Sequence, residues 1–520
     1  MISDFSFQMQ SAMTTRARTI LTNTGFNVAG MALTSVIALA LTPLLLRGLG
    51  SELFGVWALF GVVIALSQML DLGLGRALVR RAAQSRLQGQ WSHLAAHFNS
   101  DFWPLLGVAT LLTGLVWLAS PHLARLLGAP AALIPLGAAV LRLMALSFAP
   151  MLCTLILTAV LEGAQRMAYT SLATVLNRFT FAAVALLAVS AGRGLVGVAV
   201  AHVAASLLQV LALWLASRRV QPGLRASPRL SRQRLLAQDW RFGRFVFATS
   251  LIALAYTATN KVALARWTGM TSVAYYELAA VVAGQLFILA LAVAQALYPA
   301  FAAAQSEGGS ESVRRLFVRS LRLSTLIVAP LGAAIIALAT PFIGAWFGQP
   351  LPQPAQALQW LTLAWTIVSL AAGASVALQA TGRPALAWLL AVYNMAMNLI
   401  LVLLLIPRYG FSGLIAANSL AVGSSGMLTL VVFGRASRLD LRAMLAALSP
   451  GVLAWIILLA LGLSWLGARL SQPTLTQVAI LGCIYALCYA AGLMILLRPE
   501  ESAWLRQHLR PRGLLQGMTP

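Results

Sequence analysis

Long apolar runs of about 20 residues make up most of the chain, and each can cross a bilayer core of roughly 30 Å as a helix. Backbone groups cannot stay unpaired in lipid, so spanning segments are helices or closed barrels. Barrel strands would read as short alternating segments, which these unbroken runs are not. We therefore predict an all-α polytopic membrane protein with about 14 transmembrane helices. The expected spans are residues 25–46, 53–74, 101–120, 136–161, 169–190, 194–216, 243–265, 273–301, 318–346, 356–380, 384–406, 411–434, 448–468 and 474–497.

The motifs between these runs occur twice along the chain. Arg47–Gly50 matches Arg266–Gly269 at an offset of 219 residues, and Glu162–Arg166 matches Gln379–Arg383 at an offset of 217. Parallel repeats in membrane proteins are typical of transporters in which two lobes surround a central substrate path. Two further pairs match at similar offsets, Asn177 with Asn394 and His202 with Asn418.

The repeat predicts two six-helix lobes, followed by two helices that lie outside it. A long basic connection containing Pro222 and Pro228 separates the lobes, and we expect part of it to lie on the inner membrane surface. The predicted organisation is an N-lobe at 1–216, a cytoplasmic basic linker at 217–242, a C-lobe at 243–435, the two extra C-terminal helices at 436–497 and a cytoplasmic amphipathic tail at 498–520.

The formal net charge of +24 could suggest a nucleic-acid-binding protein, but the placement of the charges argues against this. With the N-terminus in the cytoplasm, 27 of the 36 basic residues fall in inner loops, tails and the inner ends of spans, six fall in outer loops and three lie well inside spans. This is the positive-inside distribution of membrane proteins. We therefore expect a multi-pass membrane protein with both termini cytoplasmic. Its basic loops would contact anionic membrane lipids, and no nucleic acid would be a partner.

The sequence contains no pattern that indicates catalysis, a cofactor or a metal. It has no GxxxxGKS or GxxxxGKT phosphate loop, so ATP-driven transport within this chain is not expected. His93 and His97 are four residues apart, but no third ligand or adjacent Glu completes a metalloprotease pattern. We therefore expect a transporter rather than an enzyme, without cofactor or metal. A coupling ion, H⁺ or Na⁺, is left open.

Three basic residues within predicted spans are the main candidates for a substrate site: Arg142, Arg178 and Lys261. A charge at the centre of a membrane helix costs at least about 2.5 kcal/mol on insertion scales, so each needs an explanation. Such cations in a cleft would attract an anionic headgroup, and arginine offers a planar fork for phosphate oxygens. Alternatively, these side chains snorkel or pair, Lys261 with Glu277. The expected substrate-binding residues are Lys261, Arg142, Arg178, Asn260, Tyr256, Glu277 and Asn27.

One acid–base pair is expected to be structural rather than functional. Glu162 and Arg166 are four residues apart at the inner end of a predicted span. We expect them to share one helix face and to form a modest i,i+4 ion pair.

Several segments resemble the polysaccharide transporter family, the O-antigen and exopolysaccharide flippases, within the multidrug/oligosaccharidyl-lipid/polysaccharide exporter superfamily. The resemblance covers roughly residues 20–435 and implies two six-helix lobes, a central cavity and alternating access. Members often carry an acid where Asn260 stands, so ion coupling by analogy is not expected at that position. The segments that carry the resemblance are Arg47-Gly-Leu-Gly-Ser-Glu-Leu-Phe-Gly-Val-Trp-Ala-Leu-Phe60, Asp71-Leu-Gly-Leu-Gly-Arg76, Leu161-Glu-Gly-Ala-Gln-Arg166, Phe242-Gly-Arg-Phe-Val-Phe and Asn260-Lys-Val-Ala-Leu-Ala-Arg266 with Tyr275-Tyr276.

The resemblance implies an inner-membrane flippase that moves an undecaprenyl-pyrophosphate-linked oligosaccharide to the periplasmic leaflet for lipopolysaccharide or exopolysaccharide synthesis. Its expected partners are the lipid-linked oligosaccharide, anionic lipids, a polysaccharide polymerase and glycosyltransferases. The alternatives are a cation-coupled multidrug antiporter, a peptidoglycan-precursor flippase and a non-transporting scaffold for glycan assembly. An antiporter needs an intramembrane carboxylate for its cation, for which Glu277 is the deepest candidate.

Overall fold

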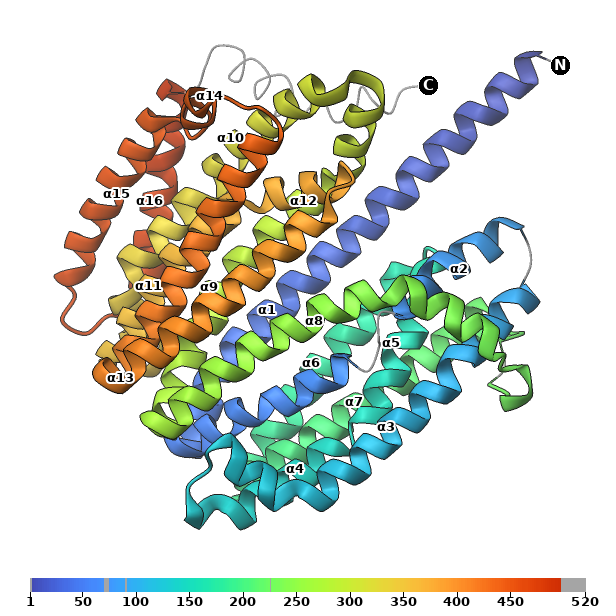
Figure 1. Ribbon diagram of the computed structural model, residues 1–520. Helices are drawn as coiled ribbons and strands as arrows, with labels where there is room; N and C mark the ends of the chain where they lie inside the picture. The colour runs from blue at the N-terminus through green and yellow to red at the C-terminus, as the bar shows by residue number, and fades with distance from the viewer. Residues whose placement is uncertain (1, 70–73, 89–90, 225, 497–520) are drawn as a thin grey trace. The chain divides into compact units, whose positions relative to one another are not determined.

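The computed structural model describes residues 2–69, 74–88, 91–224 and 226–496, and these residues contain helices and turns without any strand (Figure 1). The prediction of an all-α chain is confirmed, and the predicted tail at 498–520 lies outside the described residues. The elements are α1 (Ile2–Met69), α2 (Leu74–Gln88), α3 (Trp91–Leu127), η1 (Ala131–Leu133), α4 (Ile134–Ala145), α5 (Phe148–Gly163), α6 (Met167–Ser190), α7 (Gly194–Val220), η2 (Pro228–Leu230), α8 (Gln233–Trp267), α9 (Met270–Ala296), α10 (Tyr298–Phe347), α11 (Pro352–Leu370), α12 (Ala372–Ala380), α13 (Pro384–Ala436), α14 (Leu441–Ala447), α15 (Pro450–Ala468) and α16 (Leu475–Leu496).

Eleven helical segments of the described chain are long and apolar enough to cross a membrane. Helix α1 contains the first predicted span and residues 53–69 of the second, on either side of Gly50, and α13 contains two others on either side of Gly410. Both glycines have positive φ values, 79° and 54°, so the helix direction changes there without a loop. Helix α8 contains another predicted span, which is not among the eleven. The multi-pass architecture is confirmed, and the count of fourteen stays a prediction.

The predicted span 136–161 is two helices rather than one. Helix α4 ends at Ala145, α5 begins at Phe148, and Pro150 lies in the first turn of α5. Proline has no backbone N–H and is tolerated in the first turn of a helix, but inside one it removes a hydrogen bond. The break just before Pro150 is therefore the arrangement in which the proline costs least.

The internal repeat is visible in the backbone conformation. Positive φ values occur at Gly50 and Gly269, which correspond at the offset of 219, and at Gln165 (60°) and Gly382 (78°), which correspond at 217. Glycine adopts this region readily, whereas a residue with a side chain does so rarely. Because Gln165 adopts it as well, the turn is set by the surrounding fold and is common to both halves.

The turns at Gln165 and Gly382 also share their hydrogen bonds. The Arg166 N–H donates to the Leu161 carbonyl at 2.9 Å, and the Arg383 N–H donates to the Leu378 carbonyl at 2.8 Å. This six-residue closure ends a helix by pairing its last carbonyls. It also corrects one expectation, because α5 ends at Gly163 and Arg166 lies outside it. Glu162 and Arg166 therefore do not have the i,i+4 geometry of a single helix.

The described chain divides into two compact units. Unit 1 comprises Met1–Glu277 and Val402–Phe411. In it, α6 packs on α7 and α1, α3 packs on α4, and α2 packs on α5, while α8 packs on α1, α2 and α3. Large side chains such as Phe60 and Leu141 are fully buried in this unit.

The linker between α7 and α8 is held to α3 by two buried polar side chains. The Ser227 N–H donates to Asn99 Oδ1 at 2.6 Å, and the Arg232 N–H donates to Ser100 Oγ at 2.8 Å. Both acceptors are fully buried, so these bonds satisfy polar groups that could not otherwise reach water. Helix α8 thus begins at a fixed point of unit 1.

Unit 2 comprises Leu278–Leu401 and Ser412–Pro520, and within its described part α10 contacts α11, α12, α14, α15 and α16. One apolar cluster joins α10, α12 and α13, with the rings of Phe317 and Phe433 4.3 Å apart. The predicted division into lobes at residues 217–242 stays a prediction.

Candidate functional site

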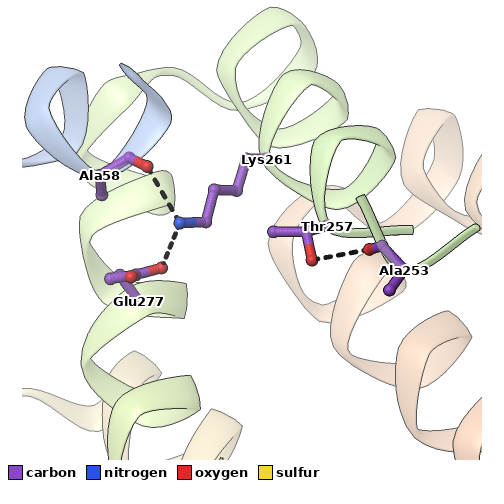
Figure 2. Close-up of polar contacts among 5 residues, drawn as sticks. All are labelled: Ala58, Ala253, Thr257, Lys261 and Glu277. Atoms are coloured by element: carbon purple, nitrogen blue, oxygen red, sulfur yellow. Dashed lines mark hydrogen bonds and ion pairs between the residues drawn. The ribbon is translucent and has the colours of Figure 1, made fainter. Parts of the chain in front are cut away.

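Lys261 is the most deeply placed cation among the candidates, and it is paired. It lies on α8 in unit 1 and is 7% exposed. Its Nζ is 2.7 Å from Glu277 Oε2 and donates to the Ala58 carbonyl oxygen at 2.9 Å (Figure 2). Lys261 is therefore paired with Glu277 in this structure, which is one of the alternatives to a free cation in the cavity.

The arrangement at Lys261 offsets the cost of a buried charge. An ammonium group has three donors, and here a carboxylate and a helix carbonyl accept from it. Breaking a buried pair by removing one partner costs about 3–5 kcal/mol, because the other charge is left without compensation. The Glu277 side chain is 25% exposed and the Lys261 side chain 9%, so the carboxylate is the more accessible partner.

Asn260 and Tyr256 lie on α8 beside Lys261. Asn260 is completely buried, and Tyr256 is partly buried one turn earlier on the face of Asn260. On the same helix, Thr257 donates its hydroxyl to the Ala253 carbonyl at 3.1 Å (Figure 2). Together these residues give α8 a polar segment just before the charged position.

The turn between α8 and α9 packs directly against α1. A Cβ atom built on Gly55 would overlap the Met270 carbonyl oxygen, so the two backbones meet with no side chain between them. The hydroxyl groups of Ser51 and Thr271 lie 3.4 Å apart beside this contact. The backbones of α1 and of the α8–α9 turn are therefore in direct contact, three residues before Ala58, which accepts from Lys261.

Arg266, at the end of α8, makes a further contact of this turn. Its guanidinium donates to the Leu126 carbonyl oxygen at 2.6 Å, at the end of α3. Gly128, with a φ of 96°, lies against the same side chain, since a Cβ there would be 3.0 Å from Arg266 Cγ. The α8–α9 turn thus contacts both α1 and α3 within unit 1.

Arg142 bonds to α3. Its Nε donates to Ser120 Oγ at 3.0 Å and, less closely, to the Trp117 carbonyl oxygen at 3.3 Å. Its guanidinium carbon lies 5.3 Å from the centre of the Trp117 ring, within the range of a cation–π interaction. Arg142 thus has hydrogen-bonding and aromatic partners on α3, which is the arrangement of the alternative in which it pairs within the protein.

Arg178 and Asn27 are placed differently from Lys261. The Arg178 side chain is exposed on α6, and Asn27 is exposed on α1. One turn after Arg178, Phe181 stacks on Trp57 with ring centres 5.8 Å apart, and His202 of α7 packs edge-on against Phe181. An aromatic cluster from three helices therefore lies close to Arg178.

The structure adds one group that the sequence does not indicate as part of the site. The Ala58 carbonyl is a direct partner of Lys261, but alanine has no side-chain signal that could mark it. Its position in the repeat is the one clue, because Ala58 and Glu277 correspond at the offset of 219 that also relates Gly50 to Gly269.

Solved structures with the same fold define the class of protein. An inward-facing multidrug resistance MATE family transporter of the MOP superfamily is 17% identical, with a TM-score of 0.67 over 78% of this chain and 94% of its own. The lipid II flippase MurJ in an inward closed conformation is 14% identical, with a TM-score of 0.69 over 90% of this chain and 98% of its own. The chain thus has the fold of the MOP-superfamily transporters.

A family model that matches the sequence identifies the family of the chain. Residues 44–351 match the model of a family described as polysaccharide biosynthesis protein, which is more than half of the chain. The chain belongs to this family, as its motifs suggest, and it is a multi-pass membrane protein with the fold of flippases and exporters. No curated protein matches the chain by sequence.

Proposed function

We propose that the protein is an inner-membrane flippase that moves an undecaprenyl-pyrophosphate-linked oligosaccharide from the cytoplasmic to the periplasmic leaflet by alternating access. The observation that carries this proposal is the buried Lys261, which presents a positive charge in a member of the polysaccharide biosynthesis family. A fixed cation inside a membrane protein is suited to a pyrophosphate headgroup, while the polyprenyl tail can stay in the bilayer.

In the proposed mechanism, the headgroup exchanges with Glu277 for Lys261. Glu277 holds the ammonium group between transport events, and its partial exposure lets an incoming anion compete for the same atom. The exchange keeps the more buried Lys261 paired throughout, and the charge that is left without its partner is the more exposed carboxylate of Glu277. The Ala58 carbonyl would keep the ammonium group in place while its anionic partner changes.

Arg178 and Arg142 would extend the positive potential around the path. Arg178 is exposed and could meet sugar or phosphate groups, with Trp57 and Phe181 as apolar surfaces for sugar rings. Arg142 already bonds to α3 through Nε, so we assign it a smaller role than Arg178 in binding the substrate. Asn27, Asn260 and Tyr256 are proposed to line the path as hydrogen-bonding groups.

The orientation and partners follow from the charge distribution. Basic inner loops favour cytoplasmic termini and contact with anionic lipids. A polymerase and glycosyltransferases would supply and consume the carried glycan in synthesis of O-antigen or exopolysaccharide. ATP-driven transport within this chain is not expected, because it has no phosphate loop, and a coupling ion, H⁺ or Na⁺, is left open.

A complementation experiment tests the proposal. In cells whose own polysaccharide flippase is deleted, the wild-type chain should restore surface polysaccharide, Lys261→Arg should retain part of this activity, and Lys261→Ala should lose it. Equal expression in the membrane fraction serves as the control. Normal surface polysaccharide with Lys261→Ala would overturn the assignment of this site.

Two related functions are separated by their substrates. A cationic multidrug antiporter needs a carboxylate available for its cation, and here Glu277 is engaged by Lys261. Robust ion-driven efflux of a cationic dye would therefore contradict the proposal. A peptidoglycan-precursor flippase would carry the same pyrophosphate chemistry, and rescue of cells depleted of their lipid II flippase would favour it instead.

A further inference from the structure

We infer that Tyr489 and Tyr485 of α16 hold the break that Pro330 makes in the hydrogen-bond ladder of α10, so that the α15–α16 hairpin positions α10. All the groups involved belong to unit 2. The inference goes beyond the proposed function, because it concerns how a helix is held rather than what is carried.

Pro330 creates the need for an outside donor. Proline has no N–H, so the carbonyl four residues earlier, that of Leu326, loses its helical partner. The Tyr489 hydroxyl donates to this Leu326 carbonyl oxygen at 2.8 Å. In a membrane a carbonyl without a partner cannot bond to water instead, so this hydroxyl replaces the missing backbone donor.

Tyr485 makes a second hydrogen bond from α16 to α10, one turn before Tyr489. Its hydroxyl donates to the Pro330 carbonyl oxygen at 3.0 Å, and the residue is 5% exposed. Tyr485 and Tyr489 are four residues apart on α16 and therefore share one face. Two hydroxyl groups from one helix thus bond to carbonyls on both sides of the proline break.

Apolar packing fixes the hairpin along the same part of α10. Val452 and Ile456 of α15 are buried against Ala329, just before the proline. Further along, Leu338 of α10 belongs to one buried apolar cluster with Leu463 of α15 and Tyr485 of α16. The hairpin therefore contacts α10 before, at and after the break.

The hairpin is itself closely packed, which makes it suited to this role. Gly492 of α16 lies against the Trp455 indole of α15, and a Cβ atom at this glycine would overlap the ring. Gly467 of α15 faces Pro341, which like Pro330 lies inside α10 beyond its first turn, with a Cβ-to-Cγ distance of 3.2 Å. Both of these interior prolines of α10 are thus contacted by elements outside the repeat.

The position of the first half that is equivalent to Pro330 has no proline. At the offset of 217, Pro330 corresponds to Thr113 of α3, which keeps its N–H. The Thr113 hydroxyl donates to the carbonyls of Ala109 and Ala145, at 2.8 and 3.0 Å. The proline at this position and the hairpin that contacts it thus occur together in the second half, as the inference requires.

A double-mutant cycle tests the inference. Tyr489→Phe keeps the ring and removes the hydroxyl, and Pro330→Ala restores an N–H that can bond to the Leu326 carbonyl. In detergent, Tyr489→Phe should lower the unfolding midpoint by roughly 2–4 °C, and the same change in the Pro330→Ala background should have much less effect. Tyr485→Phe should have the same effect in both backgrounds, because its acceptor, the Pro330 carbonyl, is not the one that the proline deprives of a donor.

A distance measurement gives a second readout, independent of transport and of the substrate. Spin labels at Leu323 and Leu487, both exposed in unit 2, report the distance between α10 and α16 in a chain without its native cysteines. Tyr489→Phe should broaden the distance distribution, and adding Pro330→Ala should narrow it again. An equal effect of Tyr489→Phe in both backgrounds, or no effect in the wild-type chain, would overturn the inference.

Discussion

Ala58 and Glu277 occupy equivalent positions of the repeat, and both contact the ammonium group of Lys261. The first contributes a backbone carbonyl oxygen at 2.9 Å and the second a carboxylate oxygen at 2.7 Å. At the same offset of 219, Lys261 corresponds to Thr42, whose hydroxyl donates to the Ala38 carbonyl within α1. The two halves therefore share a backbone framework, while the charge belongs to one half. We expect the chemistry of the site to depend on this asymmetry.

The first prediction separates the structural role of Lys261 from its role in transport. Lys261→Met leaves the Glu277 carboxylate unpaired, so it should destabilise the protein by about 2–4 kcal/mol. The double variant Lys261→Met/Glu277→Gln removes both charges and should regain most of that stability, yet it should not transport. Unfolding in detergent and complementation measure the two effects. Normal transport by a stable double variant would exclude Lys261 from the substrate site.

The second prediction concerns the competition between Glu277 and the substrate. Glu277→Gln keeps the shape of the side chain but removes its charge, so an anionic headgroup should displace it more easily. We expect the apparent affinity for a pyrophosphate-bearing lipid to rise, by up to about tenfold. Glu311→Gln is the matched control, since Glu311 pairs with Arg314 at an exposed position. Weaker lipid binding by Glu277→Gln would contradict the exchange mechanism.

The sequence predicted the main features of this arrangement for identifiable physical reasons. The all-α membrane class follows from apolar runs, and the shared turns follow from motifs such as Glu162–Arg166. Lys261 stood out because a charge inside a span is costly. Its partner Ala58 could not be predicted, because the contact is made by a backbone carbonyl whose position depends on how α1 packs against α8. The shared helix face of Glu162 and Arg166 was wrong, because a turn follows Gly163 and its residue with positive φ is a glutamine, which does not mark such a turn in the sequence.

The third prediction tests the close contact between α1 and the start of α9. Gly55→Ala places a Cβ atom on the Met270 carbonyl oxygen, and relieving that overlap requires the two backbones to separate. We expect a loss of about 1–3 kcal/mol in unfolding free energy. Gly61→Ala on the same helix is the control, because the nearest atom to its Cβ would be Lys261 Nζ at 4.0 Å, an ordinary contact. Equal stability of the two variants would mean that the contact is not close in the membrane.

The last prediction decides between two roles for Arg142. Its Nε bonds to Ser120 Oγ and its guanidinium lies over the Trp117 ring, so the side chain joins α4 to α3. Ser120→Ala removes one of these bonds and leaves the charge, and it should cost about 0.5–1.5 kcal/mol of stability without loss of transport.

Arg142→Lys keeps the positive charge but not the planar fork, so it should cost somewhat more, about 1–2 kcal/mol. If the role of Arg142 is to join the two helices, transport by both variants will follow their stability, as measured by unfolding and by complementation at matched membrane levels. If Arg142→Lys instead loses transport while remaining as stable as Ser120→Ala, the guanidinium must act on the substrate itself, since the two variants disturb the same contact between α3 and α4 and differ in the group presented to an anion.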